Sequence, residues 1–418
     1  MIIKKESNKM KIAVIGYGDR GNGYAHYFRE NGAVIEAVCD VDKNKLQQAA
    51  KKFNLTEGQV FSDEESFWAS GKIADLLIVS TMDQLHYRHV MKAIELGYDI
   101  LLEKPIAPTL RECQDIEKAA KEHGTKIYLC YVLRYTPFFM KVKELVDSGI
   151  IGKVATINLT EGVAYWHQSH SFVRGNWRNS DESTPMIIAK CSHDMDLLYW
   201  LVGVEPIAIS SMGSLMFFNE ENAPEGAAKH CSDCGLANTC PYNNFKFYSE
   251  NPHWLLKMGY CNGNSDKEVI KECLQDKANP YSRCVFYCDN NVVDHQVANI
   301  EFENGITAHL TMTAFTKDES RKIRIHGTYG EIYGSFIENK VYCELYGDDE
   351  IKVYDIEEIK GGNHGGGDVL MIRNIIDAYN QNQVIDKNGI EGAMCSHYLG
   401  FAAEESRLNG GEKISLKK

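Results

Sequence analysis

The sequence predicts two domains: an α/β Rossmann domain with a doubly wound parallel sheet, then an α+β domain with a large, mostly antiparallel open sheet. Three observations predict this fold. At 418 residues the chain is longer than a domain with a single hydrophobic core usually is. Strand and helix patterns alternate over the first 135 residues, whereas strand patterns dominate the rest. A glycine-rich turn also follows the first strand and opens the first helix, as dinucleotide-binding domains require.

Composition narrows the class of ligand. The chain has 45 basic and 58 acidic residues, a formal net charge of -13, which argues against nucleic acid and favours a small-molecule partner. The polar, Lys-rich start, residues 1–10, is followed by no apolar run of signal-peptide or bilayer-spanning type. We therefore expect no membrane partner, and a cytoplasmic protein whose 13 cysteines are mostly reduced thiols.

The Rossmann domain is expected over residues 1–135. Short apolar runs predict strands at 11–15, 34–39, 75–81, 100–102 and 126–133. Helices are expected at 42–53, at 85–96 with Gly97 as a stop, and from the Thr109–Glu112 capping box to Gly124. Strands separated by helices of this length indicate right-handed crossovers and a parallel sheet.

The second domain is expected over residues 136–418. Alternating patterns predict strands at 154–163, 297–302, 307–315, 321–326 and 340–345, with Glu303-Asn304-Gly305 as a hairpin turn. Helices are expected at 137–147, 193–201, 368–379 and 391–408. The stretch from about 220 to 283 is rich in Asn, Gly, Pro and Cys, and we interpret it as an insertion of irregular structure.

The glycine-rich turn indicates a dinucleotide site. In Gly16-Tyr17-Gly18-Asp19-Arg20-Gly21, the first glycine allows the tight turn, the second lets the backbone approach a pyrophosphate, and the third allows close helix–strand packing. Asp40 ends the second strand, where an acid accepts the ribose 2′-hydroxyl and repels a 2′-phosphate. NAD is therefore favoured over NADP, although Lys43 and Lys45 lie close by. Thr81 and Met82 end the strand near the crevice, where they would flank the cofactor.

A further set of motifs resembles the Gfo/Idh/MocA family of oxidoreductases. They are the segment from Thr81 to His86, Glu103-Lys104-Pro105 after an apolar strand, Arg134-Tyr-Thr-Pro137, Gly149-Ile-Ile-Gly152, and His193-Asp-Met-Asp196 opening a helix. The resemblance covers nearly the whole chain, with the cysteine-bearing insertion least typical. It implies a Rossmann domain joined to an open-sheet substrate domain, with His86, Glu103 and Lys104 near the cofactor. It also implies a homo-oligomer, a dimer or tetramer, formed through the open sheet face.

Lys104 and His193 are the expected catalytic residues. Hydride transfer from a carbinol carbon needs a group that takes the hydroxyl proton and a cation or donor that holds the oxygen. Lys104 follows a parallel strand at the end where the nicotinamide should lie. His193 begins a helix of the second domain and is suited to act as general base, a role that the resemblance strengthens.

The chain departs from the family pattern beside His193. Relatives carry an Asp four residues before this histidine, and this chain has Ala189 there, followed by Lys190 and Cys191. The partner that would orient His193 or bind a substrate hydroxyl is therefore missing, and Lys190 or Asp194 is expected to substitute for it. The usual Lys–Asp–His set cannot simply be carried over.

An aromatic segment supplies further substrate-binding candidates. Residues 165–178 are dense in aromatic, His and Arg side chains, which stack on sugar rings or bind hydroxyls and carboxylates. With Arg134 from the motif above, the expected substrate residues here are Trp166, His170, Arg174 and Trp177. A packed loop explains the same composition equally well. Asp294-His295-Gln296 and His364-Gly-Gly-Gly-Asp368 are weaker polar candidates.

The leading hypothesis is an NAD-dependent oxidoreductase acting on a hydroxyl carbon of a sugar, polyol or cyclic diol. One alternative keeps NAD but oxidises a sugar only transiently, so that a glycosidase or lyase reaction shows no net redox change. The other is a non-catalytic NAD-binding regulator, against which Lys104 and His193 weigh.

The insertion carries a candidate metal site. Cys231 and Cys234 have the two-residue spacing of a zinc knuckle, and Cys240 follows five residues later. We expect one structural zinc, because a polar, glycine-rich segment has little apolar material to order itself. The fourth ligand is open among His230, Cys261, Cys273, Cys284 and Cys288. Three nearby reduced thiols are the alternative, and an iron–sulfur cluster is not needed for hydride chemistry.

Overall fold

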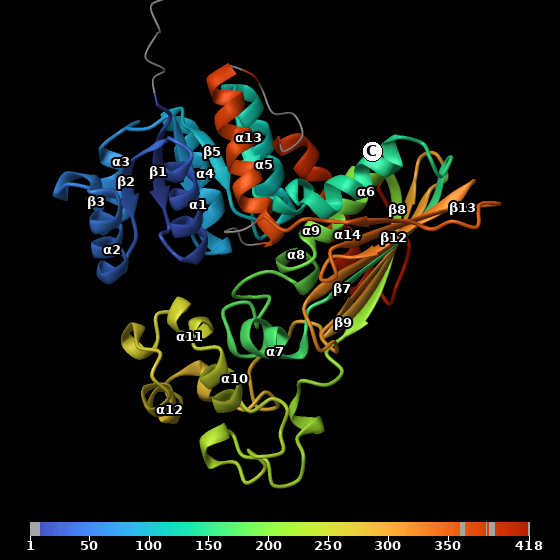
Figure 1. The fold of residues 1–418 in the computed structure, drawn as a ribbon. Helices are drawn as coiled ribbons and strands as arrows, with labels where there is room; N and C mark the ends of the chain where they lie inside the picture. The colour runs from blue at the N-terminus through green and yellow to red at the C-terminus, as the bar shows by residue number, and fades with distance from the viewer. Residues whose placement is uncertain (1–8, 360–363, 382, 384–388, 417–418) are drawn as a thin grey trace, which may run out of the picture. The chain divides into compact units, whose positions relative to one another are not determined.

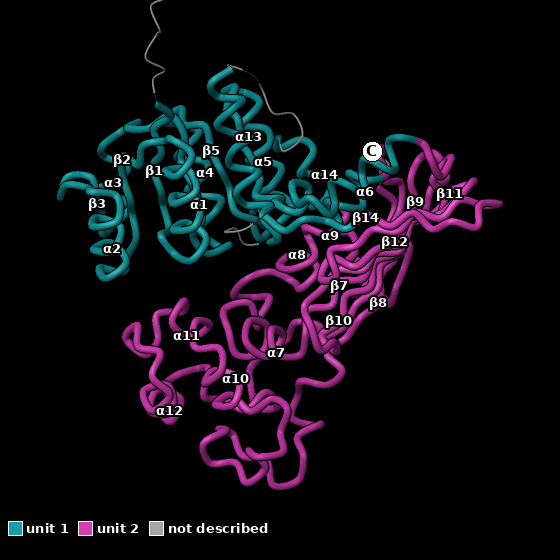
Figure 2. The backbone as a smooth tube through the Cα atoms, in the orientation of Figure 1, with its two compact units in different colours: residues 1–148, 195–201, 355–398 teal, residues 149–194, 202–354, 399–418 magenta. Residues whose placement is uncertain are grey.

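The computed structural model describes residues 9–359, 364–381, 383 and 389–416. Its chain divides into two compact units (Figures 1 and 2). Unit 1 comprises residues 1–148, 195–201 and 355–398, and unit 2 comprises residues 149–194, 202–354 and 399–418. The division differs from the expected boundary at residue 135, because unit 1 also includes segments from far along the chain.

Unit 1 contains the predicted parallel sheet. Its strand order is β3-β2-β1-β4-β5-β6, that of a doubly wound dinucleotide-binding fold. The strands are β1 (Lys11–Ile15), β2 (Val34–Cys39), β3 (Val60–Phe61), β4 (Leu76–Val79), β5 (Asp99–Leu102) and β6 (Ile127–Leu129). Every pairing is parallel. The carboxyl ends of β1 and β4 lie on either side of the strand-order reversal, where such sheets bind ligands.

The helices of unit 1 begin and end as local sequence dictates. They are α1 (Asp19–Glu30), α2 (Lys43–Phe53), α3 (Glu64–Ala69), α4 (Asp83–Leu96), α5 (Leu110–His123), α6 (Pro137–Asp147) and α13 (Gly367–Gln381), with the one-turn η2 (Val132–Tyr135). Asp42 caps α2, and the capping box of Thr109 and Glu112 opens α5. Gly97 and Gly124 end α4 and α5 in the left-handed conformation. The expected helix signals are confirmed.

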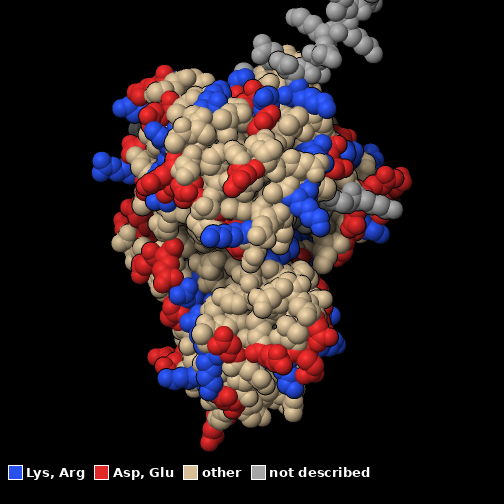
Figure 3. All heavy atoms as spheres, turned by 90° about the vertical axis from the view of Figure 1, so that its left-hand side faces the viewer, with Lys and Arg blue, Asp and Glu red and all other residues tan. Residues whose placement is uncertain are grey.

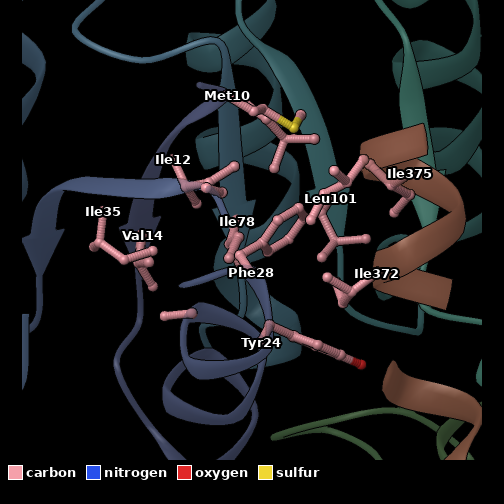
Figure 4. Close-up of a cluster of buried hydrophobic side chains, with 14 of the residues drawn as sticks. Met10, Ile12, Val14, Tyr24, Phe28, Ile35, Ile78, Leu101, Ile372 and Ile375 are labelled. Atoms are coloured by element: carbon pink, nitrogen blue, oxygen red, sulfur yellow. The ribbon is translucent and has the colours of Figure 1, made fainter. Parts of the chain in front are cut away.

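Helix α13 belongs to the core of unit 1, although it lies about 240 residues beyond β6. Its Ile372 and Ile375 side chains pack with Phe28 and Leu101 in one buried cluster (Figure 4). The sequence pattern alone shows that this helix has an apolar face but not which sheet the face covers. Burial of these side chains therefore assigns residues 367–381 to the Rossmann core.

Unit 2 is built on a mixed, mostly antiparallel sheet of order β14-β13-β12-β11-β7-β10-β9-β8-β15. Only the β7–β10 pairing is parallel among the pairings described. Its strands are β7 (Val154–Gly162), β8 (Pro206–Ser214), β9 (His295–Phe302), β10 (Thr307–Thr313), β11 (Ser320–Gly327), β12 (Gly330–Ser335), β13 (Lys340–Leu345), β14 (Lys352–Asp355) and β15 (Ile414–Ser415). The expected hairpin turn joins β9 to β10.

Four further helices come from the second half of the chain. The helices α7 (Tyr165–His167) and α8 (Met186–Ala189) are short, whereas α9 (Ser192–Val202) and α14 (Ile390–Leu408) match the expected helices closely. A seven-residue π-helical stretch, η3 (Gln168–Arg174), follows α7 and is wholly buried. The aromatic segment is therefore helical rather than a loop.

The insertion is irregular only in part, which corrects our expectation: residues 223–243 are mostly turns and irregular segments, whereas three helices follow. It contains α10 (Asn244–Glu250), α11 (His253–Lys257) and α12 (Lys267–Gln275), with short helical turns between them. These helices enclose an apolar core of their own, made by Tyr248, Leu255, Cys261, Ile270, Leu274 and Tyr281. Composition hid this core because its apolar residues are spread thinly among Asn, Gly and Lys.

Charged side chains of both signs are interspersed over the face in Figure 3, in keeping with a net charge of -13 spread over many acids. Within the described part of the chain, no helix combines the length and apolarity that a bilayer span needs.

Candidate active site

The turn between β1 and α1 has the geometry of a dinucleotide cradle. Gly16 has φ +87°, and a Cβ there would lie 2.7 Å from the Ser80 backbone. A Cβ at Gly21 would lie 2.1 Å from the Gly16 carbonyl oxygen. At Gly18, by contrast, a Cβ would meet nothing within 4 Å. Two glycines are thus required by close packing, while Gly18 leaves backbone open to a pyrophosphate.

Asp40 lies beside this turn. Its Oδ2 accepts the backbone N–H of Tyr17 at 2.6 Å, and its Oδ1 accepts that of Asp42 at 2.9 Å. The carboxylate is therefore held at the end of β2 with lone pairs to spare for a ribose hydroxyl. Tyr17 contributes its backbone here, and its buried ring packs edge-on against Phe53. These residues fit NAD: the turn would hold the pyrophosphate, and Asp40 the adenosine ribose.

The residues after β4 divide into exposed and buried ones. Met82 is 38% exposed, so its side chain is available to a cofactor. His86 is buried, with Nδ1 2.7 Å from the Pro105 carbonyl oxygen and Nε2 3.0 Å from that of Thr81. Its ring thus ties the β4–α4 turn to the segment after Lys104. A supporting role for His86 agrees with these contacts better than direct cofactor binding.

Glu103 and Arg20 contact each other rather than open space. Arg20 Nε and Tyr24 Oη each donate to Glu103 Oε1 at 2.7 Å, and Glu103 Oε2 accepts the backbone N–H of Lys104 at 3.0 Å. Arg20 also pairs with Asp368. Burial would raise the pKa of Glu103, but the Arg20 and Lys104 charges outweigh it and hold that pKa below its ordinary value. The Arg20 and Glu103 side chains, which were expected at the cofactor, therefore stabilise the turn by contacts within the protein. Asp19, at the start of α1, is exposed.

In unit 2, Lys190 and Asp194 belong to a buried ionic network. Lys190 Nζ lies 2.6 Å from Glu319 Oε1 and 3.4 Å from Glu161 Oε1. Arg321 binds both oxygens of Asp194, at 2.8 and 3.3 Å, and lies 3.0 Å from Glu161. Asp194 is fully buried. Substitution for the missing Asp by Asp194 is therefore disfavoured, because its carboxylate is already committed to Arg321.

Sequence reasoning missed three members of this network: Glu161, Glu319 and Arg321. Burial would raise the pKa of Glu161, the Arg321 and Lys190 charges oppose this, and the result lies at about 7. Glu161 and Arg321 are register partners on β7 and β11. A signal existed, since Glu161 falls on the same face of its strand as Ile157 and Leu159, where a carboxylate needs a partner. His193 itself is buried near the start of α9.

The predicted aromatic ligands mostly contact the insertion. His170 Nδ1 lies 2.8 Å from Tyr248 Oη, and its ring stacks on Tyr281 at 4.8 Å. Arg174 donates to the carbonyl oxygens of Arg283, at 2.7 Å, and Tyr242, at 3.0 Å. Such buried, satisfied contacts favour a structural role for His170 and Arg174.

Three other predicted substrate residues are Trp166, Trp177 and Arg134. Trp166 stacks on Phe247 at 5.5 Å, and Trp177 lies near Phe172; both tryptophans are partly exposed, so sugar stacking by them stays a prediction. Arg134 forms a buried two-point ion pair with Asp196, with Nε 2.7 Å from Oδ2, and this commits its guanidinium.

The zinc expectation is not supported. In the residues that the structure describes, no three Cys, His, Asp or Glu side chains converge as ligands of one metal ion. Cys231, Cys234 and Cys240 are free thiols, each half-buried. The apolar core of α10, α11 and α12 also weakens the physical motive, because this part of the insertion has apolar material to order it.

A Rossmann unit with a dinucleotide turn, joined to a unit with a large mixed sheet, defines a class of nicotinamide-dependent oxidoreductase folds. Residues 10–131 match the Gfo/Idh/MocA profile described as "Oxidoreductase family, NAD-binding Rossmann fold". Residues 143–410 match its "Oxidoreductase family, C-terminal alpha/beta domain". The chain belongs to the Gfo/Idh/MocA oxidoreductase family.

Individual relatives are distant. The chain is 24% identical over 357 residues to the putative oxidoreductase YteT of Bacillus subtilis, which covers 82% of this chain and 81% of that one. It is 24% identical over 200 residues to an inositol 2-dehydrogenase/D-chiro-inositol 3-dehydrogenase of Lactiplantibacillus plantarum, covering 47% of this chain and 53% of that one. Among solved structures, levoglucosan dehydrogenase with NADH and levoglucosan has a TM-score of 0.71 at 16% identity, covering 98% and 100%. At that identity the likeness shows the fold alone.

Proposed function

We propose that the protein is an NAD-dependent dehydrogenase that transfers hydride between nicotinamide and a hydroxyl carbon of a sugar, polyol or cyclic diol. The observation that carries the proposal is Lys104, which follows β5 in a parallel sheet whose neighbouring β1–α1 turn fits a dinucleotide. Relatives named for inositol support the substrate class, and the fold is shared with an enzyme named for levoglucosan.

NAD, when bound, supplies the hydride acceptor. The remaining chemistry belongs to the chain. The Lys104 ammonium holds the reacting oxygen by a charge-assisted hydrogen bond, which favours the alkoxide that develops as hydride leaves. His193 accepts the hydroxyl proton as general base. The glycine turn and Asp40 hold the dinucleotide, and Asp40 favours NAD over NADP because two backbone N–H groups keep its carboxylate in place.

Lys190 is the proposed replacement for the family Asp. Its side chain reaches Glu319, and burial, which would lower the pKa of the lysine, is outweighed by Glu319 and Glu161, so the net shift is upward. Lys190 therefore stays charged and is suited to donate hydrogen bonds to a substrate hydroxyl rather than to accept its proton.

One screen tests the proposed function. Sugars, polyols, cyclic diols and glycosides are incubated with NAD, while nicotinamide absorbance and product masses are recorded together. Stoichiometric NADH and a ketone or lactone product are expected. Cleavage of a glycoside without net NADH would replace the proposal with the transient-oxidation reaction, and NAD binding with no conversion of any compound would favour a regulator.

A further inference from the structure

The motif from His364 to Asp368 has no part in the function proposed above. Its glycines allow the backbone to approach other groups closely, and Gly367 does so. A Cβ at Gly367 would lie 2.3 Å from the carbonyl oxygen of Val132 in η2 and 3.0 Å from Thr136. The start of α13 is therefore pressed against the segment after β6, with no room for a side chain. The close approach is to the protein's own backbone, and it seats the next residue, Asp368, inside unit 1.

Asp368 is fully buried and lies between two partners. It forms an ion pair with Arg20, and its Oδ2 lies 2.9 Å from His364 Nδ1. Burial raises the pKa of Asp368, but the charges of Arg20 and His364 reverse this, and the net shift is downward. The carboxylate is thus a fixed negative charge facing the dinucleotide turn from its inner side.

From Asp368 a continuous set of contacts leads to the catalytic lysine. Arg20, inside the turn from Gly16 to Gly21, binds Asp368 with one end and donates from Nε to Glu103 Oε1 with the other. Glu103 Oε2 in turn accepts the backbone N–H of Lys104 at 3.0 Å. Tyr24 Oη occupies the remaining approach to Glu103 Oε1 at 2.7 Å. Asp368, Arg20 and Glu103 are each held by at least two partners.

We infer that Asp368 is a positioning residue for Lys104 and for the cofactor turn, acting through Arg20 and Glu103. The inference rests on the proposed function, because the residue that Asp368 positions, Lys104, is the one proposed to bind the reacting oxygen. With Asp368 present, Arg20 is shared between two carboxylates and cannot turn away from Glu103. Without that charge, Glu103 loses its fixed partner geometry, and both the turn and the Lys104 peptide are released.

The test compares Asp368→Asn with Met371→Ala. Met371 is buried three residues further along α13 and packs in the apolar core. NAD affinity is measured by fluorescence titration, thermal stability by melting, and kcat and KM on a substrate from the screen. For Asp368→Asn we expect NAD affinity to fall about fivefold and kcat about tenfold, with KM changed less than about twofold. For Met371→Ala we expect a similar loss of stability, with NAD affinity within about twofold of the unchanged chain.

Two further variants test the role of Asp368. His364→Ala removes one partner of Asp368 from a partly exposed position, so it should fold and shift NAD affinity in the same direction by a smaller factor. Asp368→Asn combined with Glu103→Gln should be non-additive for NAD affinity, because both act on Arg20. Equal NAD affinity in Asp368→Asn and the unchanged chain, or additivity in the double variant, overturns the inference.

The NAD titration uses no sugar substrate, so it separates the two hypotheses. If the unchanged chain binds NAD but converts no sugar or diol, the proposed substrate class fails, while the affinity comparison still decides the role of Asp368. If the unchanged chain binds no NAD, both the proposed function and this inference fall.

Discussion

At the scale of single residues, burial decides what the charged side chains do. Arg20 and Glu103 lie in motifs that resemble cofactor-binding motifs, yet the two side chains form an ion pair with each other. A buried carboxylate without a partner is costly, so side chains that fold under the turn pair with each other before any ligand arrives. Asp40, by contrast, is held by backbone N–H groups alone and keeps acceptor capacity for a ribose.

Lys104→Ala is expected to lower turnover at least about a hundredfold, because it removes the cation that holds the reacting oxygen. NAD affinity should stay within about threefold, since the glycine turn and Asp40 hold the dinucleotide. Steady-state kinetics on the substrate found by screening, with NAD titration, checks both. Lys118→Ala, at an exposed position on α5, is the control. Near-normal turnover in Lys104→Ala would refute the assignment.

NAD is expected to bind at least about tenfold more tightly than NADP, because the Asp40 carboxylate accepts a ribose hydroxyl and repels a phosphate. Titration of both cofactors at fixed ionic strength measures the ratio. Asp40→Ser should narrow it by relieving the repulsion. A chain that binds both equally before substitution would contradict the proposed role of Asp40.

At the scale of elements, the helices of the insertion are attached to the rest of unit 2 by polar and aromatic contacts with η3. His170 is central to this attachment, since its ring is buried between Tyr248 and Tyr281. Burial is the first cause that lowers its pKa, to about 3, with smaller contributions from nearby positive charge. The folded protein therefore keeps His170 neutral where the unfolded chain would bind a proton.

This difference predicts an acid-linked loss of stability. As pH falls below the ordinary histidine pKa of about 6.5, the unfolded chain gains a proton that folded His170 does not, so the free energy of unfolding decreases. Between pH 6.5 and 5 the loss from this residue is about 2 kcal/mol. His170→Gln should reduce the pH dependence of denaturant unfolding by about that amount. Identical slopes in both proteins would show that His170 is not held neutral by the fold.

At the scale of the whole molecule, the large sheet of unit 2 has unlike faces. On β10, Ala308, Leu310 and Met312 are buried, whereas Thr307, His309, Thr311 and Thr313 point to the opposite face and are partly or wholly exposed. Neighbouring β7 repeats the pattern with Thr156, Asn158 and Thr160. We propose that this Thr-rich face associates with another copy of the chain.

A dimer or tetramer is accordingly expected by light scattering at micromolar concentration. Replacing Thr311 with Arg on that face should shift the mass toward the monomer, since a charge would be buried without a partner. Lys118→Glu, at an exposed position on α5, serves as the control for a general charge effect. A monomer of the unchanged chain at these concentrations would refute the proposed interface.

Sequence alone determined those features that depend on neighbours along the chain. The parallel strands, helix caps, glycine turn with Asp40 and hairpin at Gly305 are local in origin, because backbone conformation and capping depend on residues within a few positions. Even the Cys spacing was a local signal, but no metal site corresponds to it in the described part of the chain, since spacing does not fix where thiols point.

Only the tertiary structure decided which distant residues meet. Pairing of Arg20 with Asp368, 348 positions apart, assigns α13 to the Rossmann core. Alignment of Glu161 with Arg321 across two strands likewise places Arg321 where it binds Asp194 and commits that carboxylate to an ion pair. Such contacts have no period or motif along the chain, because the partner of a buried charge is chosen by packing in three dimensions. The fold and the cofactor turn could therefore be predicted from the sequence, whereas the roles of the buried charges around them could not.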